Sequence, residues 1–207
     1  MAIDTKERTF EEEIEYCLTS TGKKSEKYVK GNPADFDRRL AMDTKAVISF
    51  IKDTQPDKWS DLCKRHGADV EEGFLKRLNA ELNNRGMIDV LRHGITDLGV
   101  EVRLAFFKPG SGMNKSATAL YEKNVLQITR QVKYSEANEN SIDSVIFLNG
   151  LPIITIELKN PLTGQTYKNA IVQYQNDRNP REALLTFKKR ALVHFAVDTD
   201  EVYMTTK

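Results

Sequence analysis

The sequence predicts an α/β protein, of the kind also described as α+β, in which a mixed central sheet is flanked by helices. Two observations predict this class. From Phe10 to about Asn84 the apolar residues recur at helical spacing, and from Val100 onward the chain turns to segments rich in branched and aromatic residues. A helix is predicted inside this second part, from Tyr167 to about Gln175. Helices followed by strands with inserted helices favour a sheet that is covered on both faces.

The composition excludes several classes of protein. The chain has 207 residues, of which 40% are hydrophobic and 29% charged, with 11 Gly and 6 Pro. Disordered and collagenous chains have other compositions, and this length suits one well-buried domain. We therefore predict a single domain over residues 1–207, with a helical part at about 1–99 and a sheet-containing core at about 100–207. The net charge of +1 neither favours nor excludes nucleic acid, so any basic surface must be local.

The cysteines and the apolar runs bear on the compartment. Cys17 and Cys63 lie far apart and form no CxxC pair, so neither a disulfide framework nor a zinc site is indicated. No apolar run approaches the roughly 18 residues that span a bilayer, and the charged start lacks the apolar core of a signal peptide. We expect a cytoplasmic protein with no membrane partner.

The helical part is expected to contain helices separated by polar connectors. A first helix follows from the spacing of Phe10, Ile14, Cys17 and Leu18. The connector 19–35 is polar and contains Gly22, Gly31 and Pro33. A second helix is indicated by Leu40, Val47, Ile48 and Ile51, and a third follows the turn 53–57, around Trp59 and Leu62.

Strands dominate the second part of the chain. The segments that read as strands are VEVRLAFF (100–107), VLQITRQVKY (125–134), IDSVIFL (142–148), LPIITIEL (151–158) and LVHFAV (192–197). The polar segment 110–116 reads as a mobile loop that leads into a helix. Another helix is predicted from about Arg181 to Lys189, before the strand 191–197.

The strongest local signal is Asn149-Gly150 between two apolar runs, which predicts a hairpin from Ile142 to Lys159. Two registers are open. A two-residue loop places Asp143 opposite Ile156, on the face away from Glu157. A three-residue loop that includes Leu148 places Asp143 opposite Thr155, and then Asp143, Thr155, Glu157 and Lys159 share one face.

Glu157 and Lys159 require an explanation because they follow an apolar strand whose interior would not tolerate unpaired charge. One reading places them at the solvated end of the strand, where they pair with each other. The other reading adds Asp143, which precedes Glu157 by 14 residues across the predicted hairpin. Carboxylate oxygens that converge beside a cationic side chain are ligands that Mg²⁺ favours.

The residues around these acids resemble the amino-terminal nuclease domain of type I restriction enzyme R subunits, a member of the PD-(D/E)xK superfamily. The resemblance covers most of the chain. It is densest at Asn124, Thr129-Arg130-Gln131, 142–152, 156–161 and 170–173, and weaker at Phe10-Glu11 and Ile14. It implies a restriction-endonuclease-like mixed sheet flanked by helices.

The resemblance also implies roles for individual residues. Asp143 and Glu157 would bind the metal, with the carbonyl of Leu158 as a further ligand. Lys159 would orient the attacking water and stabilise charge on the scissile phosphate. Glu11 matches a helical acid that supports the metal through water, and Gln173 matches the Gln of a Gln-xxx-Tyr element that helps to place the site and the DNA.

Two positions depart from the pattern of the family. Asp177 stands where the family usually has the Tyr of the Gln-xxx-Tyr element, and Ile142 stands where a Pro can precede the first acid. The first departure bears on how that element works and on the level of activity.

The resemblance implies Mg²⁺ as cofactor, with Mn²⁺ as a substitute, and double-stranded DNA as substrate. It also implies modification and specificity subunits as partners, and an ATP requirement that belongs only to the full-length, motor-containing subunit. Local charge agrees with DNA: residues 158–190 contain seven Lys and Arg against two acids, and residues 103–134 contain six against one. The alternative hypothesis is a non-catalytic DNA-binding or docking module of the same fold, which has no need of a shared cation.

Overall fold

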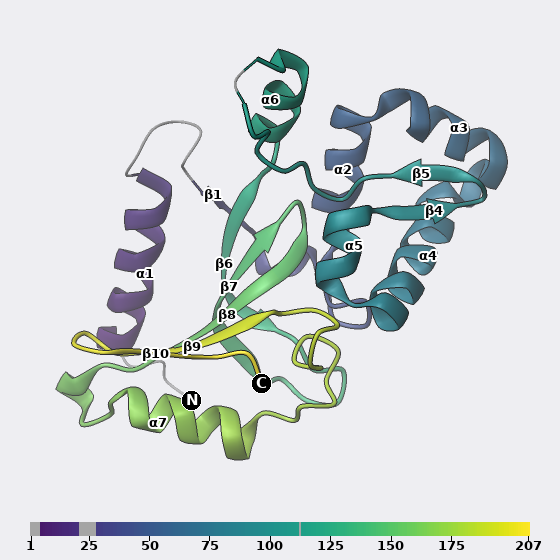
Figure 1. Cartoon of the computed structure of the whole chain (residues 1–207). Coiled ribbons are helices and arrows are strands. Elements are labelled where there is room, and N and C mark those ends of the chain that lie inside the picture. Colours follow the sequence, from purple (N-terminus) through teal and green to yellow (C-terminus); the bar gives the residue numbers. More distant parts are fainter. Residues whose placement is uncertain (1–4, 21–27, 112) are drawn as a thin grey trace.

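The computed structural model describes residues 5–20, 28–111 and 113–207, and a six-stranded mixed sheet lies at its centre (Figure 1). The strand order is β1-β6-β7-β8-β9-β10, with β1 parallel to β6, β8 parallel to β9 and the other neighbours antiparallel. The strands are β1 (Val29–Lys30), β6 (Leu126–Lys133), β7 (Ser141–Leu148), β8 (Leu151–Leu158), β9 (Val193–Val197) and β10 (Val202–Thr205). The predicted α/β class with a mixed sheet is confirmed.

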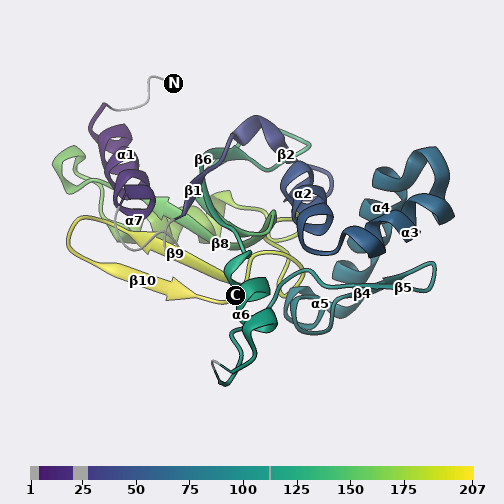
Figure 2. The ribbon, with the colours of Figure 1, turned by 90° about the horizontal axis from the view of Figure 1, so that it is seen from above.

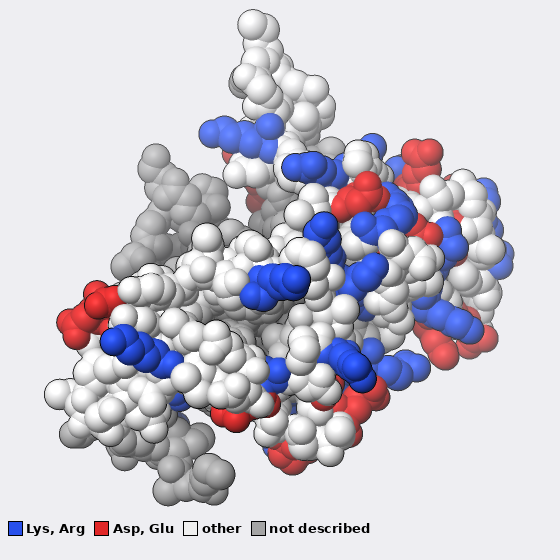
Figure 3. Space-filling view, turned by 60° about the horizontal axis from the view of Figure 1, so that its bottom comes forward, with Lys and Arg blue, Asp and Glu red and all other residues white. Residues whose placement is uncertain are grey.

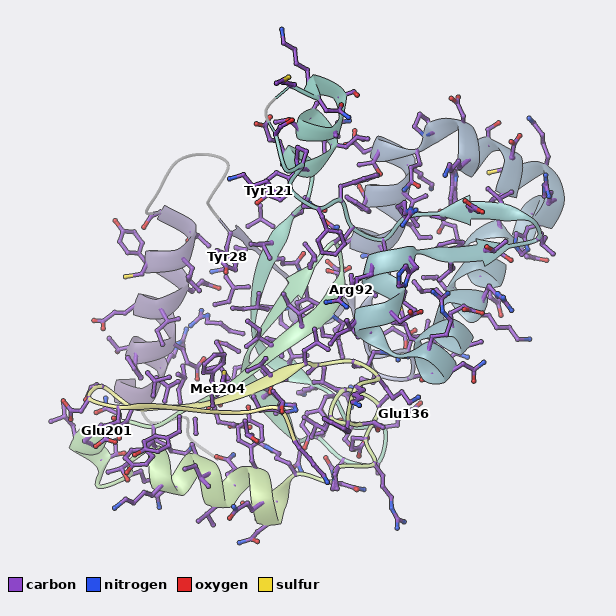
Figure 4. All side chains as sticks on the ribbon, in the orientation of Figure 1. Tyr28, Arg92, Tyr121, Glu136, Glu201 and Met204 are labelled. Atoms are coloured by element: carbon purple, nitrogen blue, oxygen red, sulfur yellow. The ribbon has the colours of Figure 1, made fainter. Side chains whose placement is uncertain are left out.

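Helices cover the sheet on both faces. On one face α1 (Thr5–Ser20) packs through Phe10, Ile14 and Leu18 onto the core of the sheet. Figure 4 shows Tyr28 between α1 and the sheet, where it joins the same apolar cluster. The other side is covered by α7 (Tyr167–Val172), which contacts β8 and β9, and by the segment that follows it. The two strands of the predicted hairpin, β7 and β8, therefore lie in the middle of the sheet.

Most of the remaining helices form a separate lobe beside the sheet (Figure 2). Its core includes Phe50, Trp59, Phe74 and Leu78, and it extends to Leu151 at the start of β8. The lobe consists of α2 (Thr44–Thr54), α3 (Pro56–His66), α4 (Val70–Arg85), α5 (Met87–His93) and the small antiparallel pair β4 (Ile95–Asp97) and β5 (Val100–Val102). A second small pair, β2 (Phe36–Asp37) with β3 (Met42–Asp43), precedes α2.

The strand expected at 100–107 is shorter than predicted and does not join the main sheet. β5 ends at Val102 and pairs with β4. The side chain of Gln55 forms hydrogen bonds with both backbone groups of Arg103. Its Oε1 accepts from the Arg103 N–H at 2.9 Å, and its Nε2 donates to the Arg103 carbonyl at 2.9 Å. These bonds satisfy the groups that a longer strand would offer to a neighbour.

The helix expected at 181–189 is also wrong, because this segment consists of successive turns. Its backbone bonds run mainly over three residues, as from the Leu185 N–H to the Glu182 carbonyl at 2.9 Å. Lys188 has a positive φ of 65°, which interrupts any helix there. The expected helix start after the loop 110–116 is confirmed, since α6 (Lys115–Glu122) begins there, with the side chain of Asn114 accepting from the Ala117 N–H.

The turns at 181–189 lead into a buried arginine that joins the two parts of the molecule. Arg190 is 1% exposed and donates to the carbonyl of Leu40 at 3.0 Å and to the side-chain oxygens of Asn79 and Asn83 on α4. Burial lowers its pKa to about 10. All of these acceptors are neutral, so the contacts of Arg190 are those of a structural residue.

The predicted hairpin turn at Asn149-Gly150 is present and deeply buried. Both residues have positive φ, 52° and 84°, as a type I′ turn requires. Asn149 is 2% exposed, and its side chain bonds to the backbone of Val125 and Leu104. The carbonyl of Gly150 accepts from the Asp43 N–H at 2.9 Å, so the tip of the hairpin is fixed to the start of the helical lobe.

We expect the substitution Gly150→Ala to destabilise the protein by more than about 2 kcal/mol, because it combines two penalties. A Cβ at this position would lie 2.5 Å from the carbonyl oxygen of Asp43 and 2.6 Å from the nitrogen of Val47, and the φ of +84° disfavours any side chain. Urea denaturation of the two proteins measures the difference.

The matched control for this substitution is Gly164→Ala. Gly164 also has a positive φ, of +78°, but a Cβ there meets no atom within 4 Å. This variant should lose only the conformational part, about 1 kcal/mol. Equal losses in both variants would contradict the close docking of the turn.

Within the described part of the chain, the structure has no helix with the length and apolar character needed to cross a membrane.

Candidate metal centre

A β-bulge decides which residues of the hairpin face each other. Next to the turn Leu148 pairs with Leu151 and Phe147 with Pro152, as a two-residue loop requires. The register then shifts, and beyond the shift Ile146 pairs with Ile154 and Ser144 with Ile156. Pro152 lacks an N–H for the ladder, and prolines in sheets are found at such bulges.

The shifted register places Asp143 opposite Glu157. Neither expected register is fully correct: the loop has two residues, but the extra residue at the bulge moves Asp143 from its predicted place opposite Ile156. Asp143 therefore lies on the same face as Glu157 and Thr155, which is the consequence that the three-residue loop predicted. Bulges occur often beside active sites because they redirect side chains in this way.

The backbone and one neighbouring side chain hold the half-buried Asp143. Its Oδ2 accepts a hydrogen bond from the Leu158 N–H at 2.8 Å. Its Oδ1 accepts a longer bond from Nε2 of Gln131 at 3.4 Å. The carboxylate is thus anchored to the strand that carries Glu157, and the two acids are placed together by the hairpin itself.

Glu157 is completely buried, with 0% of its surface exposed. Its Oε1 accepts a hydrogen bond from Nε of Arg178 at 2.8 Å and forms an ion pair with Nη2 of the same residue at 2.6 Å. Its Oε2 is buried and has no hydrogen-bond partner among the described residues. A buried carboxylate oxygen without a partner is costly, and a bound cation is one way in which such an oxygen is satisfied.

The surroundings of Glu157 oppose its charge. Burial raises the pKa of Glu157 well above its usual value, the charge of Asp143 raises it further, and Arg178 acts in the opposite direction. Burial acts to lower the pKa of Arg178, but the charges and hydrogen bonds of Glu157 and Tyr134 together outweigh it, so this pKa is raised. The carboxylates of Asp143 and Glu157 carry two negative charges when ionised, and the guanidinium of Arg178 supplies one positive charge. A further cation would therefore be favoured here.

Glu11 reaches this region from α1. It is 3% exposed, and its Oε1 accepts from Nε2 of Gln131 at 2.8 Å. The same nitrogen bonds to Asp143, so Gln131 lies between the helical acid and the acid of the sheet. Gln131 has a positive φ of 51° within β6, an uncommon conformation for this residue type. Strained residues of this kind cluster at functional sites.

The other candidate site residues, Leu158, Lys159 and Gln173, follow Glu157 in the sequence. Leu158 is buried and its N–H is the donor to Asp143. Lys159 follows directly, and its N–H donates to the carbonyl of Val197 at 2.8 Å, which continues the pairing with β9. Gln173 is half-buried at the start of a π-helical segment, Gln173–Asp177, and the hydrogen bonds described for Asp143 and Glu157 do not include it.

Three further residues complete the site: Thr155, which one of the two expected registers placed on the face of Glu157, and Tyr174 and Arg178, which the sequence did not assign to it. The Thr155 hydroxyl lies 2.9 Å from the hydroxyl of Tyr174 and 2.7 Å from Nδ1 of His194. Burial raises the pKa of Tyr174 and lowers that of His194, so both are neutral near pH 7. The period-2 alternation with Glu157 was the available signal for Thr155. Arg178 was counted only as one charge in a basic segment.

The tyrosine beside the two acids is Tyr174, whereas the Gln-xxx-Tyr element of the resembling family has its tyrosine at the position of Asp177. Asp177 is exposed, whereas the Tyr174 hydroxyl contacts the strand that carries Glu157. The departure noted at Asp177 therefore does not leave the site without a tyrosine.

The arrangement fits a hard divalent cation. Asp143 and Glu157 offer carboxylate oxygens on one face, and Mg²⁺ is commonly held by one or two protein carboxylates together with water and substrate phosphate. In the described ranges, no group of three or more His, Cys, Asp and Glu side chains is placed to hold a metal. Two carboxylates on one face are fewer ligands than a closed structural site uses.

A protein family model matches nearly the whole chain. Its description is the type I restriction enzyme R protein N terminus, and the match covers residues 15–207. Asp143, Glu157 and Arg178 lie inside the matched range, and Glu11 lies just before it. Neither a curated protein nor a solved structure matches the chain.

Proposed function

This chain belongs to the family of type I restriction enzyme R protein N termini, and we propose that it hydrolyses phosphodiester bonds of DNA with the help of Mg²⁺. The observation that carries the proposal is the buried Oε2 of Glu157, which has no hydrogen-bond partner among the described residues and belongs to the face that Glu157 shares with Asp143. Its substrate is double-stranded DNA, and its partners are the modification and specificity subunits of a type I restriction-modification complex. ATP serves a motor in the full-length subunit.

Asp143 and Glu157 would hold the cation, with the carbonyl of Leu158 and the distant support of Glu11 as further contributions. When bound, Mg²⁺ supplies a water of lowered pKa and neutralises charge on the phosphate. The Leu158 N–H keeps the carboxylate of Asp143 oriented toward β8. Arg178 keeps Glu157 from carrying an uncompensated buried charge.

Lys159 would act on the phosphate. Alternation along the extended chain places it on the side of Glu157, two residues earlier. Its ammonium would bind the scissile phosphate, stabilise the charge that grows on it, and orient the water that attacks. Gln173, which begins the π-helical segment beside Tyr174, would help to place the DNA.

The surface charge supports a DNA substrate. Figure 3 views the molecule with its lower side brought forward, and Lys and Arg are spread over the middle of this face while acids lie mainly toward its margins. Sequence-independent contacts to DNA phosphates need positive charge of this kind.

We expect Lys159→Ala to keep Mn²⁺ binding and to lower the rate of plasmid nicking by about 100-fold or more, the cost of losing one donor to a transition-state charge. Calorimetric Mn²⁺ titration and nicking of supercoiled plasmid, on the same preparation of the 207-residue chain, measure both quantities.

Lys64→Ala is the control, because Lys64 is an exposed lysine on α3, in the helical lobe. It should leave both quantities unchanged. Undiminished nicking by Lys159→Ala would overturn the role of Lys159. Absence of Mn²⁺ binding by the wild type, with and without DNA, would favour the docking module instead.

A further inference from the structure

We propose that Arg178 is a positioning residue, which holds one oxygen of Glu157 so that the other oxygen stays turned toward the cation. This inference rests on the proposed metal-dependent function. Arg178 is not one of the proposed catalytic residues Asp143, Glu157 and Lys159, and the inference gives it a role in assembling the metal centre.

The first argument is the geometry of the contact. Arginine and carboxylate commonly form two parallel bonds, each to a different oxygen. Here both nitrogens of Arg178 converge on Oε1 of Glu157, at 2.8 and 2.6 Å. In the part of the chain that the structure describes, no hydrogen-bond donor reaches the buried Oε2. The one-sided contact leaves Oε2 available to a cation that Glu157 would share with Asp143, the other acid that acts on this carboxyl group.

The second argument is that Arg178 is itself held in place. Its side chain is 7% exposed, and its guanidinium lies 5.7 Å from the ring centre of Tyr134 and bonds to the hydroxyl of that residue. Tyr134 is 1% exposed and follows β6. The guanidinium is thus packed between a fixed ring and a fixed carboxylate, which are the conditions for a precise contact.

The third argument is the backbone that delivers Arg178. It comes directly after the π-helical segment Gln173–Asp177, which continues α7. Such segments are rare and occur frequently at functional sites. The π-helical segment brings Tyr174 and Arg178 to the same strand, because Tyr174 contacts Thr155 and Arg178 contacts Glu157.

Arg190 shows what a structural arginine looks like in the same molecule. It is also buried, but its acceptors are backbone carbonyls and asparagine oxygens. Among the described residues, Arg178 is the guanidinium that contacts Glu157. The two arginines therefore form a matched pair for an experiment.

The experiment compares Arg178→Lys and Arg178→Met with Arg190→Lys in the 207-residue chain. Mn²⁺ affinity is measured by calorimetry, and unfolding is followed by heat with and without Mn²⁺. We expect Arg178→Met to bind Mn²⁺ about 10- to 100-fold more weakly, the range found when the partner of a metal ligand is removed. Arg178→Lys should fall between this variant and the wild type, because one ammonium keeps the charge but cannot make two converging bonds.

Arg190→Lys should melt at a lower temperature than the wild type and bind Mn²⁺ with unchanged affinity. If Arg178→Met does not fold, the comparison of Arg178→Lys with Arg190→Lys decides, since both keep their charge. Wild-type affinity in a folded Arg178→Lys and Arg178→Met would overturn the positioning role while leaving the metal centre in place. A wild type that binds no Mn²⁺ would instead overturn the proposed function itself.

Discussion

Replacement of Asp143 by asparagine is expected to abolish Mn²⁺ binding and DNA cleavage while the chain stays folded. Asparagine has the same shape, and its oxygen can still accept from the Leu158 N–H, which lies 2.8 Å from Oδ2 in the wild type. The substitution removes the negative charge on which the cation depends. We expect the affinity for Mn²⁺ to fall by more than about 100-fold, beyond the loss that follows from removing a ligand's partner.

The same variant should be at least as resistant to heat as the wild type in the absence of metal. The charge of Asp143 raises the pKa of Glu157, so its removal relieves a repulsion in the folded state. Calorimetric titration, plasmid nicking and thermal melting on one sample measure the three quantities. Asp61→Asn, a change of an exposed acid on α3 in the helical lobe, is the control and should match the wild type. Unchanged Mn²⁺ affinity in Asp143→Asn would remove Asp143 from the ligand set.

Replacement of Glu157 by leucine is expected to destabilise the chain by about 3–5 kcal/mol, the cost of leaving one member of a buried ion pair alone. Arg178 would keep its buried position without a counter-charge, since its side chain is only 7% exposed. The double variant Glu157→Leu with Arg178→Met should recover most of this loss, because neither charge then remains. Urea denaturation of the single and double variants forms a complete mutant cycle.

Glu157→Gln separates the charge of this residue from its shape, and pH reveals the difference. Because the pKa of Glu157 is raised in the fold, the folded chain keeps a proton that the unfolded chain releases above pH 4.5. The stability that this group contributes is therefore present at low pH and falls as pH rises through the raised pKa. Without metal, the melting temperature of Glu157→Gln should rise relative to that of the wild type as the pH increases from 5 to 8. If the difference in melting temperature between Glu157→Gln and the wild type does not change with pH, the pKa of Glu157 is not raised. If Glu157→Leu alone is as stable as the wild type, the buried ion pair with Arg178 is contradicted.

The hairpin and its acids could be predicted from the sequence, but the register between them could not. Asn149-Gly150 requires a tight turn, and the apolar runs on both sides require paired strands. The bulge after Pro152 lies in a run of consecutive isoleucines, where alternation gives no sign of which residue is extra. One additional residue moves Asp143 to the place opposite Glu157, so the decisive feature leaves almost no trace in the pattern.

Arg178 could not be predicted because its role depends on contacts between distant elements. In the sequence it is one of seven cations in a basic segment. Its burial follows from the π-helical segment before it and from Tyr134, which lies in another part of the chain. The turns at 181–189 show the same limit, because their apolar spacing resembles a helix while tertiary contacts impose a different backbone.

The sheet order has a consequence for how the chain reaches its native state. The pairing at one edge is long-range, since β1 joins β6 through Val29 and Gln127, and the side chain of Glu11 meets that of Gln131 across 120 residues. Contacts of such separation form slowly, because loop closure precedes any gain from the contact. A chain that has closed only the β7–β8 hairpin already holds both acids but lacks the guanidinium and the helical acid. The residues proposed for the metal centre are thus brought together as a set only late in folding.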